Sequence, residues 1–236
     1  MLFRRCRTGT LLLSSEETIP QGMQSLTKDP AATAHTRSRY NLLAPLYNLM
    51  EAPVEYFKYR AWRKRLWAKV TGPEVLELGV GTGKNIPYYP SDVRVTAVDL
   101  SPRMLKRARR MVRRRPDVPV TLLEMDVQQL DFPDEVFDDT VATFVFCSVP
   151  DPVLGLREAL RVTRRGGRLF LLEHMLSSRP RLAWLMKRLD PLVHWLIGVH
   201  IARRTVENAA AAGWVVDRVT SLTKNDIYRM IEAHKP

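Results

Sequence analysis

The chain has 236 residues, of which 45% are apolar, so it is long and apolar enough for one well-buried domain. Lys and Arg outnumber Asp and Glu by 37 to 25, which gives a formal net charge of +12. This excess favours an anionic partner such as acidic lipid or nucleic acid, although a basic solvated surface explains it equally well. Two cysteines, Cys6 and Cys147, indicate neither a disulfide framework nor a metal site and favour a reducing compartment.

In chain order, residues 1–36 lack sustained hydrophobic periodicity and predict a flexible N-terminal lead. Residues 40–70 have a helical pattern. Short runs rich in Val and Leu then alternate with amphipathic segments, which predicts βαβ units and a parallel sheet covered by helices on both faces. A Trp-rich helical insert at 179–204 precedes two final strands. We therefore expect a single α/β domain over residues 37–236.

The stretch "EVLELGVGTGKNIPYYP" places Gly79, Gly81 and Gly83 directly after a strand-like run. Alternate glycines let the backbone turn sharply and approach a ligand closely, and a following helix would offer free N–H groups. A dinucleotide-binding fingerprint would have its third glycine at Lys84 instead. The spacing Glu77-x-Gly79-x-Gly81-x-Gly83 resembles motif I of the class I S-adenosylmethionine (SAM) methyltransferases.

Three further stretches stand where that family has its other motifs. "VTAVDLSPRML" ends a predicted strand at Asp99, and "EMDVQQLDFPDEVFD" puts Asp126 after the next strand. "VFCSVPDPVLGLREALRVTRRGGRLFLLEH" resembles the fourth strand, the helix and the Gly-Gly turn into the fifth strand. The resemblance runs from Tyr40 to Lys235. It implies an α/β, Rossmann-like sheet of seven mostly parallel strands with helices on both faces and an antiparallel last strand.

The resemblance also implies that SAM is the cofactor. In the family, the first of these acids accepts the ribose hydroxyl protons, and the second, with the N–H of the next residue, meets the adenine. The segment "RYNLLAPLYNLME" resembles the Tyr-x(6)-Tyr opening of the ubiquinone/menaquinone C-methyltransferases and their bacterial phospholipid N-methyltransferase relatives, where it folds over the SAM pocket. Core packing of both tyrosines is the alternative. The expected cofactor-binding residues are Tyr40, Glu77, Gly79, Gly81, Gly83, Asp99, Leu100, Asp126, Val127 and Phe144.

Methyl transfer from a sulfonium is an in-line displacement, so the protein has to orient the acceptor and, where needed, take up its proton. No metal is required, and we expect none. The candidate catalytic residues are Glu173 and His174, at the end of the fifth predicted strand, and Tyr47 in the N-terminal segment. A carboxylate or a neutral imidazole at that edge of the sheet could accept a proton, although a purely structural role remains open for each residue.

Two segments suit a membrane surface. In "PVEYFKYRAWRKRLWAKV" the aromatic residues share one helical face, on which Arg63 is the charged exception, and most of the other basic residues lie outside it. The insert at 179–204 carries Trp184 and Trp195 beside basic residues. Packing on the sheet would explain the first segment equally well, and a substrate lid or dimer packing would explain the insert. We find no run of about 18 uncharged apolar residues that would span a bilayer.

The family resemblance and these segments together favour a methyltransferase that acts on an amphiphile at the inner face of a membrane, as a cytoplasmic peripheral protein. Phosphatidylethanolamine N-methylation is the leading expectation. C-methylation of a menaquinol or ubiquinol precursor and S-methylation of a small thiol are the alternatives. RNA methylation is a remote one, because "FCSVPDP" stands where an amine-binding "N-P-P-[FY]" tetrapeptide would be, and we expect no nucleic-acid partner.

Overall fold

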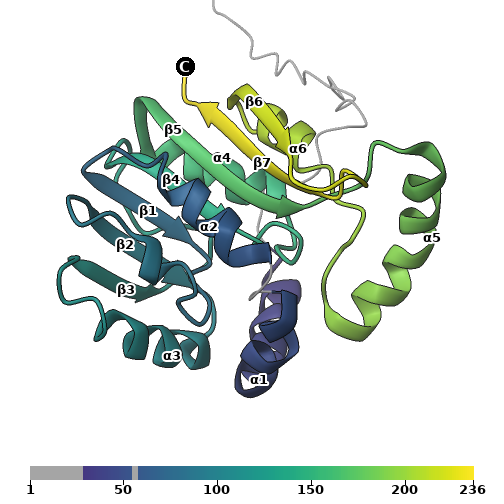
Figure 1. Cartoon of the computed structure of the whole chain (residues 1–236), viewed down its shortest axis with the longest axis horizontal. Helices are drawn as coiled ribbons and strands as arrows, with labels where there is room; N and C mark the ends of the chain where they lie inside the picture. The colour runs from purple at the N-terminus through teal and green to yellow at the C-terminus, as the bar shows by residue number, and fades with distance from the viewer. Residues whose placement is uncertain (1–28, 55–57) are drawn as a thin grey trace, which may run out of the picture.

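The computed structural model describes residues 29–54 and 58–236 and contains one seven-stranded sheet in the order β3-β2-β1-β4-β5-β7-β6 (Figure 1). Strand β7 is antiparallel to both of its neighbours, and the pairs β1/β2, β1/β4, β2/β3 and β4/β5 are parallel. The predicted fold class is therefore confirmed. The strands are β1 Glu74–Leu78, β2 Arg94–Asp99, β3 Val120–Glu124, β4 Phe137–Thr143, β5 Thr163–His174, β6 Val215–Ser221 and β7 Tyr228–His234.

Helices cover both faces of this sheet (Figure 1). The helical elements are α1 Pro30–Val54, α2 Arg60–Trp67, the 3-10 turn η2 Ile86–Tyr88, α3 Pro102–Val112, α4 Pro152–Val162, α5 Pro180–Ile197 and α6 Thr205–Ala211. Along β5, Leu169 and Leu171 join the buried cluster that includes α4 and α6, whereas Phe170 and Leu172 join the cluster that includes α2 and α3. Because successive strand residues point to opposite faces, a run that is apolar at every position is what a sheet covered on both sides requires.

The N-terminal boundary of the domain differs from the prediction. Helix α1 begins at Pro30, so residues 30–36 are helical and are not part of a flexible lead. The carboxylate of Asp29 accepts hydrogen bonds from the N–H groups of Ala31 (2.9 Å) and Ala32 (3.2 Å), which satisfies donors that a helix start leaves free. An Asp followed by Pro at the first helical position is a start signal that periodicity alone overlooks. The rest of the predicted lead lies outside the described residues.

The expected α-helix after the glycine loop is also wrong, because this segment contains only the single turn η2. Pro90 has no N–H with which to continue the hydrogen-bond ladder, so the turn cannot extend into a helix. The loop that follows β1 therefore offers backbone N–H groups from turns and not from a helix N-terminus.

The predicted insert at 179–204 is helical only over α5, which ends at Gly198 in the left-handed conformation (φ 76°). Helix α5 lies at the outer edge of the molecule, on the right in Figure 1, well apart from the strands. In the described part of the chain, no helix is both long and apolar enough to cross a bilayer.

Candidate functional site

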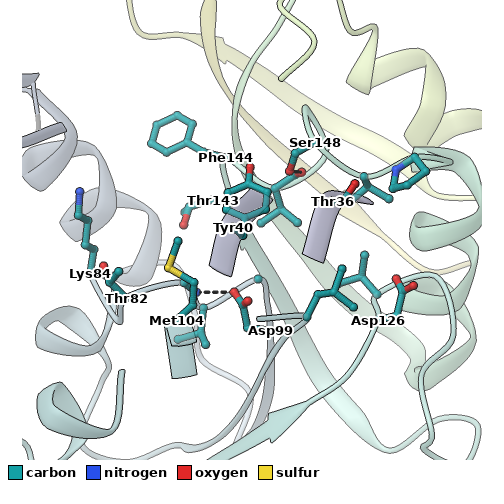
Figure 2. Close-up of a pocket in the computed structure, with 18 of the residues that line it drawn as sticks. Thr36, Tyr40, Thr82, Lys84, Asp99, Met104, Asp126, Thr143, Phe144 and Ser148 are labelled. Atoms are coloured by element: carbon teal, nitrogen blue, oxygen red, sulfur yellow. Dashed lines mark hydrogen bonds between the residues drawn. The ribbon is translucent and has the colours of Figure 1, made fainter. Parts of the chain in front are cut away.

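A pocket lies at the carboxyl ends of β1, β2, β3 and β4, which bring distant parts of the chain together (Figure 2). Its wall comes from the loops after these strands and from helices α1, α2 and α3, which contribute Thr36, Tyr40, Arg63 and Met104. The expected residues that line it are Tyr40, Gly79, Gly81, Asp99, Leu100, Asp126, Val127 and Phe144. Two expected cofactor residues, Glu77 and Gly83, are not part of the wall.

The three glycines of the loop differ in what surrounds them. Gly81 has φ +55°, and a Cβ built there would meet nothing within 4 Å, so its backbone faces the open pocket. A Cβ at Gly79 would lie 2.6 Å from Val145 Cγ2, and at Gly83 it would lie 2.7 Å from Ile86 Cδ1. Gly79 and Gly83 therefore leave room for neighbouring side chains, whereas an added Cβ at Gly81 would point into the open pocket.

Asp99 lies between two backbone donors at the end of β2. Its Oδ2 accepts from the N–H of Gly81 and its Oδ1 from the N–H of Ser101, each at 2.8 Å. Burial raises the pKa of this carboxyl to about 6 even though the two N–H groups favour the charged form. Ser101 itself caps α3 by accepting from Met104 N–H (3.2 Å), so Asp99 is not used as a helix cap and points into the pocket (Figure 2).

Asp126 is held at the other end of the pocket. Its Oδ1 accepts from the N–H of Gln128 (2.9 Å), and its Oδ2 accepts from the hydroxyl of Thr33 on α1 (3.2 Å). Leu100 and Val127 supply apolar wall between the two carboxylates. A ribose diol beside Asp99 and an adenine between apolar side chains near Asp126 would find matching chemistry here, so these residues fit SAM.

Glu77 is fully buried, and its hydrogen bonds hold the loop that follows β1. It accepts hydrogen bonds from Asn85 Nδ2 and from the hydroxyl of Tyr89. Burial raises its pKa to about 7. Asn85 Oδ1 in turn accepts from Arg63 (2.8 Å), whose guanidinium also donates to Thr143 Oγ1 (2.9 Å).

Arg63 and Thr143 line the pocket but were not among the expected site residues. Arg63 did carry a signal in the sequence, because it is a charged residue on the otherwise aromatic face of its helix. It is 5% exposed, and its guanidinium lies 5.3 Å from the centre of the Phe144 ring. A buried charge needs hydrogen-bond partners, so a charged residue on an otherwise apolar helical face indicates a polar site.

The expected catalytic residues lie outside this pocket or outside the described side chains. Glu173 is fully buried, and its Oε1 accepts from the N–H groups of Val145 (3.0 Å) and Phe146 (3.2 Å), an arrangement that holds the loop after β4. Burial raises the pKa of Glu173 to about 7 and lowers that of His174 below its ordinary value. The backbone of Tyr47 belongs to α1, but its side chain is outside the described residues.

A cluster of aromatic rings adjoins the pocket on the side of β7. Phe144 lines the pocket with φ +58°, an uncommon conformation for a bulky residue, and its ring centre lies 4.6 Å from that of Tyr59 and 6.1 Å from that of Tyr228. The hydroxyls of Tyr59 and Tyr228 are 2.9 Å apart, and Trp62 and His174 contact the Tyr228 ring. We call Tyr59, Trp62, Phe144, His174 and Tyr228 the ring cluster.

A second cavity lies on the far side of the ring cluster. Trp62 and Tyr228 form part of its wall, and the lysines Lys58 and Lys224 complete it together with uncharged residues. The rings therefore separate the pocket that suits SAM from a cavity with cationic side chains. Sequence patterns give no sign of this cavity, because its walls come from the N-terminal helices and from the β6–β7 connection.

The fold and the pocket together define a SAM-dependent methyltransferase of class I, and comparison with known proteins agrees. The family model described as a methyltransferase domain matches residues 76–171. The chain is 43% identical over 151 residues, 61% of its length, to a phosphatidylethanolamine N-methyltransferase from Cereibacter sphaeroides, 74% of which is covered. It therefore belongs to the SAM-dependent methyltransferases, and SAM is its cofactor.

One further relative supports the same family, and one solved structure supports the fold. The ubiquinone/menaquinone biosynthesis C-methyltransferase of Proteus mirabilis is 31% identical over 185 residues, which cover 75% of this chain and 72% of that protein. A solved structure of a possible histamine N-methyltransferase from Thermotoga maritima aligns with a TM-score of 0.66 over 86% of this chain and 100% of that chain. At 21% identity this last match supports the fold alone.

Proposed function

We propose that this methyltransferase transfers methyl groups to the amine of phosphatidylethanolamine at the inner face of an anionic membrane, up to the trimethylated lipid. The observation that carries the proposal is the 43% identity to a protein named as a phosphatidylethanolamine N-methyltransferase, of which the chain covers 74%. That identity exceeds the 31% to the quinone C-methyltransferase over a similar share of the relative.

The ring cluster supports an amine as the acceptor. An amine that receives three methyl groups ends as a quaternary ammonium without N–H groups, so hydrogen bonds cannot hold it through the whole series, whereas aromatic faces can. Phe144 lines the SAM pocket, and Tyr59 and Tyr228 pack against it. Lys58 and Lys224 in the adjoining cavity match the phosphate that neighbours the amine in the lipid.

The residues of the chain have separate tasks in this reaction. Asp99 and Asp126 hold the ribose and adenine of SAM, and SAM supplies an activated methyl group. The ring cluster receives the unprotonated amine and excludes water around it. In each transfer one N–C bond would form as the methyl–sulfur bond of SAM breaks, S-adenosylhomocysteine would leave, and the amine would release a proton before the next transfer. We assign His174 to positioning, because its ring packs edge-on against Tyr228 at 5.2 Å while it does not line the SAM pocket.

The test is transfer of label from methyl-labelled SAM to acceptors offered separately: phosphatidylethanolamine in anionic vesicles, a demethylated quinol, a small alkyl thiol and RNA. We expect label in the lipid, and its loss in Asp99→Ala but not in Asp92→Asn, an exposed acid outside the pocket wall. Label confined to the quinol would replace the proposal by C-methylation, which the match to the Proteus enzyme favours as the second candidate. Label confined to the thiol or to RNA would also overturn it.

A further inference from the structure

We propose that the outward face of α5 docks on an anionic bilayer, and that Arg39 transmits docking to the helix that covers the SAM pocket. The inference rests on the proposed function in one respect only, namely that the acceptor resides in the same bilayer. It names a membrane-facing surface and a route by which the membrane regulates cofactor binding.

The outward face of α5 is apolar, whereas an ordinary surface helix turns its polar face outward and its apolar face toward the core. Its large side chains recur at spacings of three and four residues and so share one side of the helix. Trp184 is 64% exposed, Leu192 54% and Trp195 70%, whereas Met186 on the opposite side is 5% exposed. The docking face consists of Trp184, Leu185, Leu189, Leu192, Trp195 and Leu196.

The charges on α5 favour an anionic bilayer as the occupant of this face. Arg181, Lys187 and Arg188 are exposed on or beside it, and Arg188 lies over the Trp184 ring at 5.8 Å. The only acid in the helix, Asp190, is turned inward, where it accepts from the N–H groups of Ile201 (2.6 Å) and Ala202 (2.9 Å) and contacts His200 Nδ1 (2.8 Å).

Tryptophans flanked by cationic side chains, without an exposed acid, suit the interface of an anionic membrane. A second copy of the same face would instead bring arginines against arginines. Charge complementarity therefore selects acidic lipid over self-association.

The C-terminal end of α5 is joined to α1 by Arg39. Its two terminal nitrogens donate to the carbonyl oxygens of His194 and Trp195, each at 2.8 Å. These carbonyls belong to the last turn, where that of His194 also accepts from the N–H of Gly198 (2.8 Å), and a cation there complements the helix dipole. A Cβ at Gly198 would lie only 2.7 Å from Arg39 Nη1, so the guanidinium packs directly against the helix end.

Arg39 also adjoins the pocket, because the next residue, Tyr40, and Thr36 one turn earlier line it. Thr33 of the same helix donates to Asp126. A bilayer that immobilises α5 therefore also stabilises the closed position of α1 over the cofactor. By linkage, bilayer binding raises the affinity for SAM, and SAM raises the affinity for the bilayer by the same factor.

The first experiment measures sedimentation of the full chain with vesicles of phosphatidylglycerol and phosphatidylcholine, which contain no phosphatidylethanolamine. We expect Trp184→Ser/Trp195→Ser to weaken binding on the order of tenfold or more. The matched control, Val215→Ser/Val219→Ser, changes two exposed apolar residues of β6 (44% and 41% exposed) and should bind like the native chain. SAM affinity without vesicles shows that each variant is folded.

The second experiment measures SAM affinity with and without the same vesicles. The native chain should bind SAM about 5- to 10-fold more tightly with vesicles, a coupling of ordinary size. Arg39→Gln should still sediment with vesicles but lose this gain. Arg110→Gln, which removes an exposed arginine from α3, is the charge-matched control and should keep it.

Three results would overturn the inference. The tryptophan variant could sediment like the native chain, or it could change the oligomeric state without changing vesicle binding, which would make the face a self-association surface. Alternatively, Arg39→Gln could keep the vesicle-dependent gain in SAM affinity. Because neither experiment supplies a methyl acceptor, failure here is distinguishable from failure of phosphatidylethanolamine as the substrate.

Discussion

The SAM pocket and the docking face of α5 differ in whether their side chains already have contacts within the protein. In the pocket, Asp99 receives two backbone N–H groups and Asp126 a third. On α5, by contrast, Trp184 and Trp195 are mostly exposed to water. A region whose polar groups are already oriented is prepared for a small polar ligand, whereas apolar area left in water indicates a large partner that supplies the missing contacts.

A second contrast lies within the pocket region itself. Asp99, Glu77 and Glu173 stand at or near the carboxyl ends of β2, β1 and β5, and burial raises the pKa of each. Only Asp99 lines the pocket, whereas Glu77 and Glu173 hold the loops after β1 and β4. A raised pKa alone therefore does not identify a ligand-binding acid in this protein.

The largest expected effect tests the oriented pocket. In Asp99→Asn, the amide nitrogen would face one of the two backbone donors, Gly81 N–H or Ser101 N–H, and the charge that we expect to receive the ribose hydroxyls would be gone. We expect SAM affinity measured by calorimetry to fall about 100-fold, which corresponds to about 2.8 kcal/mol. Asp92→Asn is the control, and native-like binding by Asp99→Asn would show that this carboxylate does not contact the cofactor.

The next effect separates backbone strain from contact with the ligand. Gly81 (φ +55°) and Gly166 (φ +72°) both adopt the left-handed conformation, and an added Cβ would meet nothing within 4 Å at either position. Alanine at each position should cost about 1–2 kcal/mol of stability. Only Gly81→Ala should also weaken SAM binding, roughly 30-fold, because its methyl group enters the pocket. Equal SAM affinity in the two variants would contradict our assignment of Gly81.

The pH dependence of SAM binding provides a third test. Burial raises the pKa of Asp99 to about 6 in the free protein. As the proposed partner of the ribose hydroxyls, this carboxyl should accept them best when it is ionised. SAM affinity should therefore be nearly constant above pH 7 and about tenfold lower at pH 5, where about a tenth of the groups remain ionised. The measurement is the SAM dissociation constant from pH 5 to 8. An affinity that stays flat across this range in the native protein would contradict the assignment.

The smallest effect concerns Glu173. If this residue only holds the loop after β4, Glu173→Gln should change the rate of methyl transfer to phosphatidylethanolamine vesicles by less than about threefold. A general base would contribute about 100-fold or more, so a loss of that size would restore the catalytic role.

Glu173 should also affect stability in a defined direction. Its folded pKa of about 7 exceeds the ordinary 4.5, so its protonation stabilises the fold fully below pH 4.5, and this contribution is lost as the pH rises through 7. The loss amounts to at most about 3 kcal/mol. In urea unfolding experiments, Glu173→Gln should show a smaller decrease of stability between pH 5 and 8 than the native protein.

Much of the sheet could be predicted from the sequence, because short runs rich in Val and Leu alternate with amphipathic segments. The start of α1 at Pro30 was missed, since it depends on a cap by Asp29 that periodicity does not detect. The helix expected after Gly83 is only a single 3-10 turn, because Pro90 has no N–H with which to continue it. Of the expected cofactor residues, Asp99 and Asp126 line the pocket, whereas Glu77 lies beneath it.

The sequence by itself determined the class of fold, the cofactor and the edge of the sheet where the cofactor belongs. The fold and the cofactor follow from the resemblance of the glycine-rich loop and of the acids after the next strands to the motifs of the class I methyltransferases. The edge of the sheet follows because the carboxyl ends of parallel strands meet there. Tertiary structure alone decided that Arg63 enters the pocket, that Phe144 meets Tyr59 and Tyr228, and that the tryptophans of α5 face outward. Such contacts join segments far apart in the chain, and a helical pattern shows which residues share a face but not which way that face points.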